Sequence, residues 1–249
     1  MTDDRTGRRA VLLTAFDRPH YLETVLRSWA AVPELPSWHL RVVLDPSDAT
    51  DRIRALVEAF VGDAGLPDAE VVVNAERLGV AENPYRHLGE LFDAGYDFVV
   101  RAEDDLVVAD DVLRLFDHAS GAYADDREVA SVHAYSFERE PDGDPAALQR
   151  RPDFCPWVWG TWRDRWTDRI RPTWDRDYST WNDSPGYESG WDWNLNTRVY
   201  PAYGLVSVSP VLSRVDNIGV VGGHGTAENH ETAPTFRPEY GRVAYREVG

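Results

Sequence analysis

The 249-residue sequence has no lysine, a single cysteine and no long apolar run, and each of these absences excludes a class of protein. One cysteine, Cys155, can form neither a disulfide within the chain nor a cysteine-rich zinc site, and we expect it to be a small core residue. No apolar stretch reaches the roughly 18 residues that a membrane helix needs. Residues 1–9 are polar and lack the apolar region of a signal peptide. These observations predict a cytoplasmic protein without a membrane span.

The chain is strongly acidic. Its formal net charge is −17 and its isoelectric point is about 4.7. Nucleic-acid binding requires clustered cations along the phosphate backbone, so we expect no nucleic-acid partner. All 26 basic residues are arginines, whose side chain suits two-pronged recognition of a carboxylate or a phosphate.

The first half of the sequence alternates short apolar runs with amphipathic segments. Apolar runs occupy residues 10–15, 40–44 and 70–74, and a fourth lies within 96–108. After each of the first three, apolar residues recur at helical spacing: Leu22, Val25, Leu26 and Trp29; Ile53, Leu56, Val57 and Phe60; and Tyr85, Leu88 and Phe92 within a helix expected over 84–94. Strands about thirty residues apart and separated by helices predict βαβ units and a parallel sheet.

The fourth apolar run is interrupted by three consecutive carboxylates, Glu103, Asp104 and Asp105. Burying adjacent negative charges without a partner costs several kcal/mol. A divalent cation is the simplest partner, because hard cations bind carboxylate oxygens, and ligands of α/β sheets collect where the strands end. The alternative is a solvated acidic turn before a helix, although Asp110 and Asp111 can already cap that helix.

The pattern changes in the second half. Strands are expected over 129–136 and 205–211, a surface loop over 138–153 and a weakly periodic polar tail over 222–249. Residues 157–193 are rich in tryptophan; Trp159, Trp162 and Trp166 have helical spacing and are expected in the core. Trp157, Trp181 and Trp191 are candidates for stacking on sugars. We expect one catalytic unit, with a nucleotide-binding half (10–125), an acceptor half (126–226) and a C-terminal tail (227–249).

Four segments in this order resemble a known family. They are Arg77-Leu78-Gly79-Val80 with Asn83; Glu103-Asp104-Asp105; Trp157-Val158-Trp159-Gly160-Thr161-Trp162-Arg163-Asp164-Arg165-Trp166; and Gly190-Trp191-Asp192-Trp193 with Asn217-Ile218-Gly219. The set resembles inverting nucleotide-sugar glycosyltransferases of the GT-A fold, in particular bacterial enzymes related to N-acetylglucosaminyltransferases that begin N-glycan branching. The family usually has Gly-Trp-Gly-Trp where this chain has residues 157–160.

The resemblance implies an α/β fold of the GT-A (Rossmann-like) type, with a mostly parallel central sheet flanked by helices and a tryptophan-rich acceptor side. It implies transfer of a sugar from a nucleotide-diphosphate sugar, UDP-sugar first, to a carbohydrate or natural-product acceptor with inversion. Mn²⁺ or Mg²⁺ would be bound by Asp105, with Glu103 and Asp104 contacting the ribose or metal-bound water. His224, between glycines, would add a nitrogen ligand or touch the diphosphate; the alternative is an exposed histidine in a glycine-rich turn.

The resemblance also implies a catalytic base. Asp192 matches the aspartate that activates the acceptor hydroxyl, and Glu188 is the fallback. If Asp192 lies on a helix, Trp191 and Trp193 would shield it from water and raise its pKa toward the working range of a base. The alternative is a helix cap formed by Ser189 or Asp192.

Residues that follow the early strands are expected to contact the nucleotide, because ligands gather at the carboxyl ends of parallel strands. Asp45 could accept from the ribose or the uracil N–H, and Arg77 could lie against the base or reach a phosphate. The alternative for each is a solvated turn. The full set of expected contacts is Thr14, Ala15, Phe16, Asp17, Arg18, Asp45 and Arg77.

Two other functions compete with this one. A sugar-1-phosphate nucleotidyltransferase shares the α/β layout, but it normally needs a glycine-rich basic loop after the first strand and a catalytic lysine. Here the loop is Phe16-Asp17-Arg18-Pro19 and lysine is absent. A non-catalytic carbohydrate-binding protein on a transferase scaffold is the other alternative, against which the retained carboxylates argue.

Overall fold

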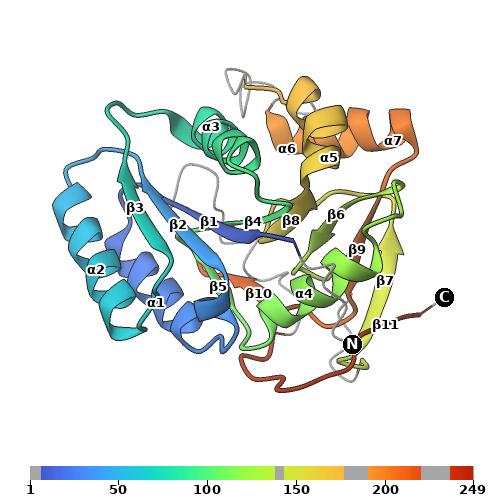
Figure 1. Cartoon of the computed structure of the whole chain (residues 1–249), viewed down its shortest axis with the longest axis horizontal. Helices are drawn as coiled ribbons and strands as arrows, with labels where there is room; N and C mark the ends of the chain where they lie inside the picture. The colour runs from blue at the N-terminus through green and yellow to red at the C-terminus, as the bar shows by residue number, and fades with distance from the viewer. Residues whose placement is uncertain (1–6, 138–142, 177–189, 220–235, 249) are drawn as a thin grey trace.

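The fold was obtained as a computed structural model that describes residues 7–137, 143–176, 190–219 and 236–248. Its centre is a nine-stranded sheet in the order β11-β7-β9-β6-β8-β4-β1-β2-β3. Helices cover both faces: α1, α2 and α4 lie on one side, and α3, α5, α6 and α7 on the other (Figure 1). The predicted α/β class with a mostly parallel sheet is confirmed.

The first four strands of the large sheet are parallel and hydrogen-bonded in the order β4-β1-β2-β3. They are β1 (Arg9–Ala15), β2 (His39–Leu44), β3 (Ala69–Val73) and β4 (Phe98–Glu103). Helices α1 (Pro19–Ala30), α2 (Thr50–Asp63) and α3 (Gly79–Asp93) alternate with them. Strand–helix alternation was readable from the sequence because each element carries its own hydrophobic period.

Successive residues of a strand point to opposite faces, and the two cores follow this alternation. In β4, Phe98, Val100 and Ala102 join the core that contains α1, α2 and α4 (Val112–Ala122). Val99 joins the second core, which contains α3 and most of the buried tryptophans. Arg101 and Glu103 therefore point to the tryptophan-rich face.

The other half of the sheet mixes directions. β8 (Trp159–Trp162) runs antiparallel to both β4 and β6 (Val129–His133). β9 (Val206–Pro210) is parallel to β6, and β7 (Ala147–Arg151) is antiparallel to β9. The start of β8 thus lies beside the carboxyl ends of β4 and β6. A separate small sheet pairs β5 (Leu106–Val108) with β10 (Val215–Asn217).

The tryptophan-rich face is built from short helical turns. α5 (Arg163–Arg165) continues through the turns Trp166–Ile170 and Arg171–Thr173. α6 (Trp191–Asn194) continues through Leu195–Val199 into α7 (Tyr200–Tyr203). Trp174 and Trp191 stack with their ring centroids 4.5 Å apart. None of the helices in the described part of the chain has both the length and the apolarity needed to cross a bilayer.

Four expectations about elements were wrong. Residues 147–151 of the expected surface loop form β7, and 246–247 of the tail form β11 (Arg246–Glu247), which extends the same sheet edge. Trp159 and Trp162 lie in β8 rather than in a helix, although both are buried as expected. Trp191 is 1% exposed and cannot stack on a ligand without repacking. The strand outcomes depend on partners that are distant in the sequence, whereas Trp191 of α6 stacks with Trp159 and Trp174.

Helix α3 begins at Gly79, five residues before the expected start at Pro84. The proline is tolerated inside the helix even though it removes one backbone donor. Similarly, neither Asp110 nor Asp111 caps α4, because α4 has no side-chain cap hydrogen bond. The Asp110 carboxylate instead accepts from the Tyr240 N–H at 2.8 Å, and the Asp111 carboxylate lies within 2.9 Å of the Arg214 guanidinium.

Candidate active site

The acidic triplet lies where β4 leaves the large sheet for the small one. Glu103 is the last residue of β4, and Asp104 and Asp105 form the turn before β5. Asp104 is 3% exposed and Asp105 is 9% exposed. The residues expected to follow β1 lie beside this turn, because Thr14 of β1 is in register with Glu103.

Arg18 is the direct partner of the two aspartates. Its guanidinium donates to Asp105 Oδ2 at 2.7 Å and also pairs with Asp104 Oδ1. Asp104 Oδ2 accepts from the Phe16 N–H at 3.2 Å. The loop after β1 therefore folds over the acidic turn, and both Asp104 oxygens are engaged within the chain.

A second arginine neutralises the remaining carboxylate. Arg101 is 1% exposed, and its Nη1 donates to Glu103 Oε1 at 2.5 Å. The guanidinium carbon also lies 4.9 Å from the ring centroid of Trp191. Because residues two apart on a strand share a face, the pairing of 101 with 103 follows from β4 itself.

The two arginines do not fully offset the three carboxylates. Burial and the neighbouring Glu103 charge raise the pKa of Asp105 to about 6, against the opposing effect of Arg18. Burial also raises the pKa of Asp104. A turn that holds its anions at raised pKa would gain from further positive charge.

The segment Asn217-Ile218-Gly219 closes over the triplet from β10. The Ile218 N–H donates to the Asp105 carbonyl at 2.9 Å. A Cβ placed on Gly219 would lie 2.3 Å from Asp105 Oδ2. Only glycine lets the backbone approach the carboxylate this closely. Gly219 belongs to a segment that carries the resemblance, but its approach to Asp105 was not predicted, because the β5–β10 pairing that brings them together joins residues about a hundred positions apart.

The donor chemistry of the turn fits a hard divalent cation, since it offers carboxylate oxygens with negative charge in excess. The described residues contain no group of three His, Cys, Asp or Glu side chains that could hold a metal. Asp105 Oδ2 could serve as a ligand only if Arg18 releases it. His224, the other expected ligand, and Glu188, the fallback base, lie outside the described residues.

The other expected nucleotide contacts lie around this edge of the sheet. The Thr14 hydroxyl donates to the Ala102 carbonyl at 3.4 Å, and the Ala15 carbonyl accepts from the Asp45 N–H at 3.0 Å. Asp17 is exposed. Arg77 is also exposed, and its guanidinium carbon lies 4.1 Å from the Phe16 ring centroid. The Arg77 and Phe16 side chains form a cation–π pair on the surface beside the acidic turn.

The Asp45 carboxylate is buried and already hydrogen-bonded within the chain. The residue is 3% exposed. Its carboxylate accepts from the N–H groups of Leu78 at 3.1 Å and Gly79 at 2.7 Å, and from Asn74 Nδ2 at 2.7 Å. Asp45 thus caps the first turn of α3 from the end of β2.

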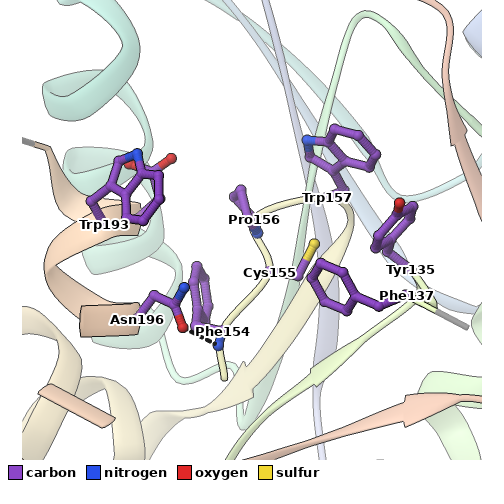
Figure 2. Close-up of a pocket in the computed structure, with 9 residues that line it drawn as sticks. Tyr135, Phe137, Phe154, Cys155, Pro156, Trp157, Trp193 and Asn196 are labelled. Atoms are coloured by element: carbon purple, nitrogen blue, oxygen red, sulfur yellow. Dashed lines mark hydrogen bonds between the residues drawn. The ribbon is translucent and has the colours of Figure 1, made fainter. Parts of the chain in front are cut away.

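Asp192 lines a pocket of about 390 Å³ at the same edge of the sheet. The pocket is lined by Tyr135, Phe137, Phe154, Cys155, Pro156, Trp157, Asp192, Trp193 and Asn196. Figure 2 shows Trp193 and Asn196 on one wall and Trp157, Tyr135 and Phe137 on the facing one. Tyr135 and Phe137 follow the carboxyl end of β6, and Trp157 precedes β8. The pocket and the acidic turn therefore both lie at the end of the sheet where β4 and β6 terminate.

Trp191 connects the two parts of the site. It directly precedes Asp192, and its ring lies over Arg101, the partner of Glu103. Gly190 makes this arrangement possible, because its φ of 109° is a conformation that other residues rarely adopt. The chain therefore enters α6 with Trp191 in the core and Asp192 at the pocket.

Two buried titratable groups near the pocket are chemically inert. Burial lowers the pKa of His133 to about 3 and raises that of the Cys155 thiol to about 12. At neutral pH both are uncharged, so they can provide neither a thiolate nucleophile nor an efficient base. Among the described pocket residues, Asp192 carries the one carboxylate.

No family model matches the chain, and no curated protein matches it. Solved structures do match. A TarS 1–349 structure from S. aureus has a TM-score of 0.53 at 14% identity, covering 86% of this chain and 61% of its own. The same protein in complex with UDP has a TM-score of 0.45 at 14% identity, with coverages of 65% and 48%. The mannosyltransferase PcManGT from Pyrobaculum calidifontis, in complex with GDP-Man and Mn²⁺, has a TM-score of 0.46 at 17% identity, with coverages of 64% and 45%.

The likeness to the first TarS structure supports the predicted GT-A fold class, with its mostly parallel sheet flanked by helices. The chain spans about half to three fifths of the length of these three structures.

Proposed function

We propose that the chain is a glycosyltransferase that moves a sugar from a nucleotide-diphosphate sugar, with UDP-sugar first, to an acceptor hydroxyl with inversion. One observation carries this proposal. The acidic turn paired with Arg18 and the pocket that contains Asp192 lie at the same end of the sheet. The contact between Arg101 and the Trp191 ring connects them. With a bound divalent cation, the acidic turn could hold an anionic leaving group, and Asp192 in the pocket could deprotonate an acceptor.

The chemistry divides between these parts. Asp192 takes the proton of the acceptor hydroxyl, and the acceptor oxygen forms a bond to the anomeric carbon of the sugar. The bond from that carbon to the diphosphate breaks, and its electron pair leaves with the nucleoside diphosphate. Arg18 is placed to leave Asp105 and pair with the phosphate oxygens. Bound Mn²⁺ or Mg²⁺, held by Asp105 with His224, would neutralise charge on the diphosphate.

A non-catalytic carbohydrate-binding protein is the second candidate. The observation that favours it is that Arg18 and Arg101 together already pair with each of the three carboxylates, although they do not fully offset their charge. The aromatic pocket would suit a sugar ring in either case. A nucleotidyltransferase is disfavoured by the absence of lysine.

The test is a hydrolysis screen of nucleotide-diphosphate sugars with Mn²⁺, with Mg²⁺ and with a chelator, paired with calorimetric binding of the same donors. We expect metal-stimulated turnover of one donor, which Asp105→Asn abolishes together with the metal response. Once an acceptor is found, Asp192→Asn should keep donor affinity but lower transfer by about 10²–10⁴-fold, as loss of a general base does. Glu58→Gln, on the exposed face of α2, is the control.

Each candidate function makes a different prediction in this screen. A protein that binds glycans but no nucleotide sugar is the carbohydrate-binding alternative. An Asp105→Asn variant with the parent's activity and metal response would remove the acidic turn from the mechanism.

A further inference from the structure

The chemistry of the pocket walls identifies the kind of acceptor. We propose that the pocket takes an uncharged acceptor with an aromatic or other apolar ring system and a single reactive hydroxyl, rather than a glycan. This inference rests on the proposed function, because it names the second substrate of the same site.

The pocket is mostly apolar and is small enough for a compact ligand. Of its nine lining residues, seven are aromatic side chains, Cys155 or Pro156. Its volume of about 390 Å³ lies in the lower part of the range typical of small-molecule sites, roughly 300–1,000 Å³. Pockets of this kind bind through apolar contact and use a few polar groups to orient the ligand.

The aromatic wall is built from rings in mutual contact. The Tyr135 ring centroid lies 5.0 Å from that of Phe137 and 4.6 Å from that of Trp157, both in edge-to-face contact. This is a geometry that aromatic pairs favour. Phe137 is 44% exposed, one of the few large apolar side chains left open in the described residues. An apolar ligand that enters beside Phe137 would cover it.

The polar groups of the described walls are few. Asn196 Oδ1 already accepts from the Phe154 N–H at 3.0 Å, so its amide nitrogen is the part that remains for a ligand. Asp192 contributes one carboxylate to the walls, Tyr135 one hydroxyl, and each indole one N–H. A sugar ring carries several hydroxyls, and each one buried without a partner weakens binding. One hydroxyl beside Asp192 is what these walls can satisfy.

The charge of the described walls disfavours an anionic acceptor. Asp192 is the one charged residue among the described lining residues. Arg151 lies against Phe137, with its guanidinium carbon 4.9 Å from that ring centroid, but it is paired with Asp153 at 3.0 Å. A phosphate or carboxylate would therefore lie beside the Asp192 charge, with the Arg151 charge already offset by Asp153.

The test is binding of a planar aryl alcohol, 2-naphthol, compared with methyl β-cellobioside, by ligand-observed NMR on the full chain without nucleotide. We expect 2-naphthol to bind and the glycoside not to bind. Phe137→Ala and Trp193→Ala, which alter opposite walls, should each weaken 2-naphthol binding by about tenfold or more. Tyr203→Ala removes an aromatic ring that is 54% exposed outside the pocket and should leave binding unchanged.

The outcomes separate this inference from the proposed function. Donor hydrolysis without 2-naphthol binding, or stronger binding of the glycoside, would overturn the inference and leave the transferase standing. Pocket-dependent 2-naphthol binding without hydrolysis of any donor would uphold the ligand class and reject the transferase. Equal binding by the Phe137 and Tyr203 variants would place the alcohol elsewhere and overturn the inference.

Discussion

At the scale of single residues, Val158 has an unusual backbone conformation. Its φ is 46°, although it is β-branched and fully buried. A left-handed conformation costs a non-glycine residue about 1–2 kcal/mol. Val158 directly precedes Trp159, the first residue of β8. The valine therefore contributes core volume at the expense of backbone strain.

This strain predicts that glycine at position 158 is less destabilising than alanine. Val158→Ala and Val158→Gly both remove the buried methyl groups, but only glycine relieves the backbone. We expect the glycine variant to be more stable than the alanine variant by about 1 kcal/mol in urea unfolding. At Val132, a buried control on β6, the order should reverse by about 0.5–1 kcal/mol. The same order at both positions would argue against strain at Val158.

His133 predicts a pH dependence of stability. Because burial lowers its pKa to about 3 from 6.5, the unfolded chain binds a proton at this residue between those values and the folded chain does not. The free energy of unfolding therefore falls as pH drops below 6.5. Between pH 6.5 and 4.5 this contribution is on the order of 3 kcal/mol. Urea unfolding should show the parent losing more stability than His133→Gln over that range; parallel pH curves would contradict it.

At the scale of elements, the loops after β1 and β2 have different structural roles. The loop after β1 brings Phe16 and Arg18 to the acidic turn. Asp45, at the end of β2, holds the N-terminus of α3. Both were expected to contact a nucleotide, and that role remains a prediction for each.

Asp45 can be tested as a cap. Asp45→Ala leaves the Leu78 and Gly79 N–H groups without their acceptor, and we expect it to lower the free energy of unfolding by about 1–2 kcal/mol. Asp48→Ala, an exposed aspartate in the same loop, is the matched control. A stable Asp45→Ala protein with weakened donor binding would instead assign Asp45 to the nucleotide.

Elements were predictable where the signal is local. The first four strands and α1–α3 carry complete hydrophobic periods, so their order and most of their extent were readable. The start of α3 was not, because its cap comes from Asp45, more than thirty residues earlier. β7 was missed because its two apolar residues are followed by three polar ones, Gln149, Arg150 and Arg151, so it shows no alternating period. The acidic turn was recognised, but its arginine partners were not, since Arg18 reaches it from another strand end.

At the scale of the whole molecule, a buried ion pair ties the C-terminal segment to the core. Arg214 is fully buried and its Nε lies 2.9 Å from Asp111 Oδ1. The Tyr245 hydroxyl also donates to Asp111, and the Tyr240 ring centroid lies 3.5 Å from the Arg214 guanidinium carbon. This cluster joins α4, β10 and residues 236–248.

Breaking one partner of that pair should be costly. We expect Asp111→Asn to lower the free energy of unfolding by about 3–5 kcal/mol, because Arg214 would be left as a buried, uncompensated charge. Asp111→Asn with Arg214→Met should cost less than the sum of the single changes in a double-mutant cycle. Additive losses would show that the two side chains are not coupled.

Because Arg18 provides a counter-charge to Asp104 and Asp105, folding of the acidic turn does not require a dication. If the proposed metal dependence holds, folding and ion uptake are separate events. Chelation would then leave an inactive but intact chain rather than a misfolded one.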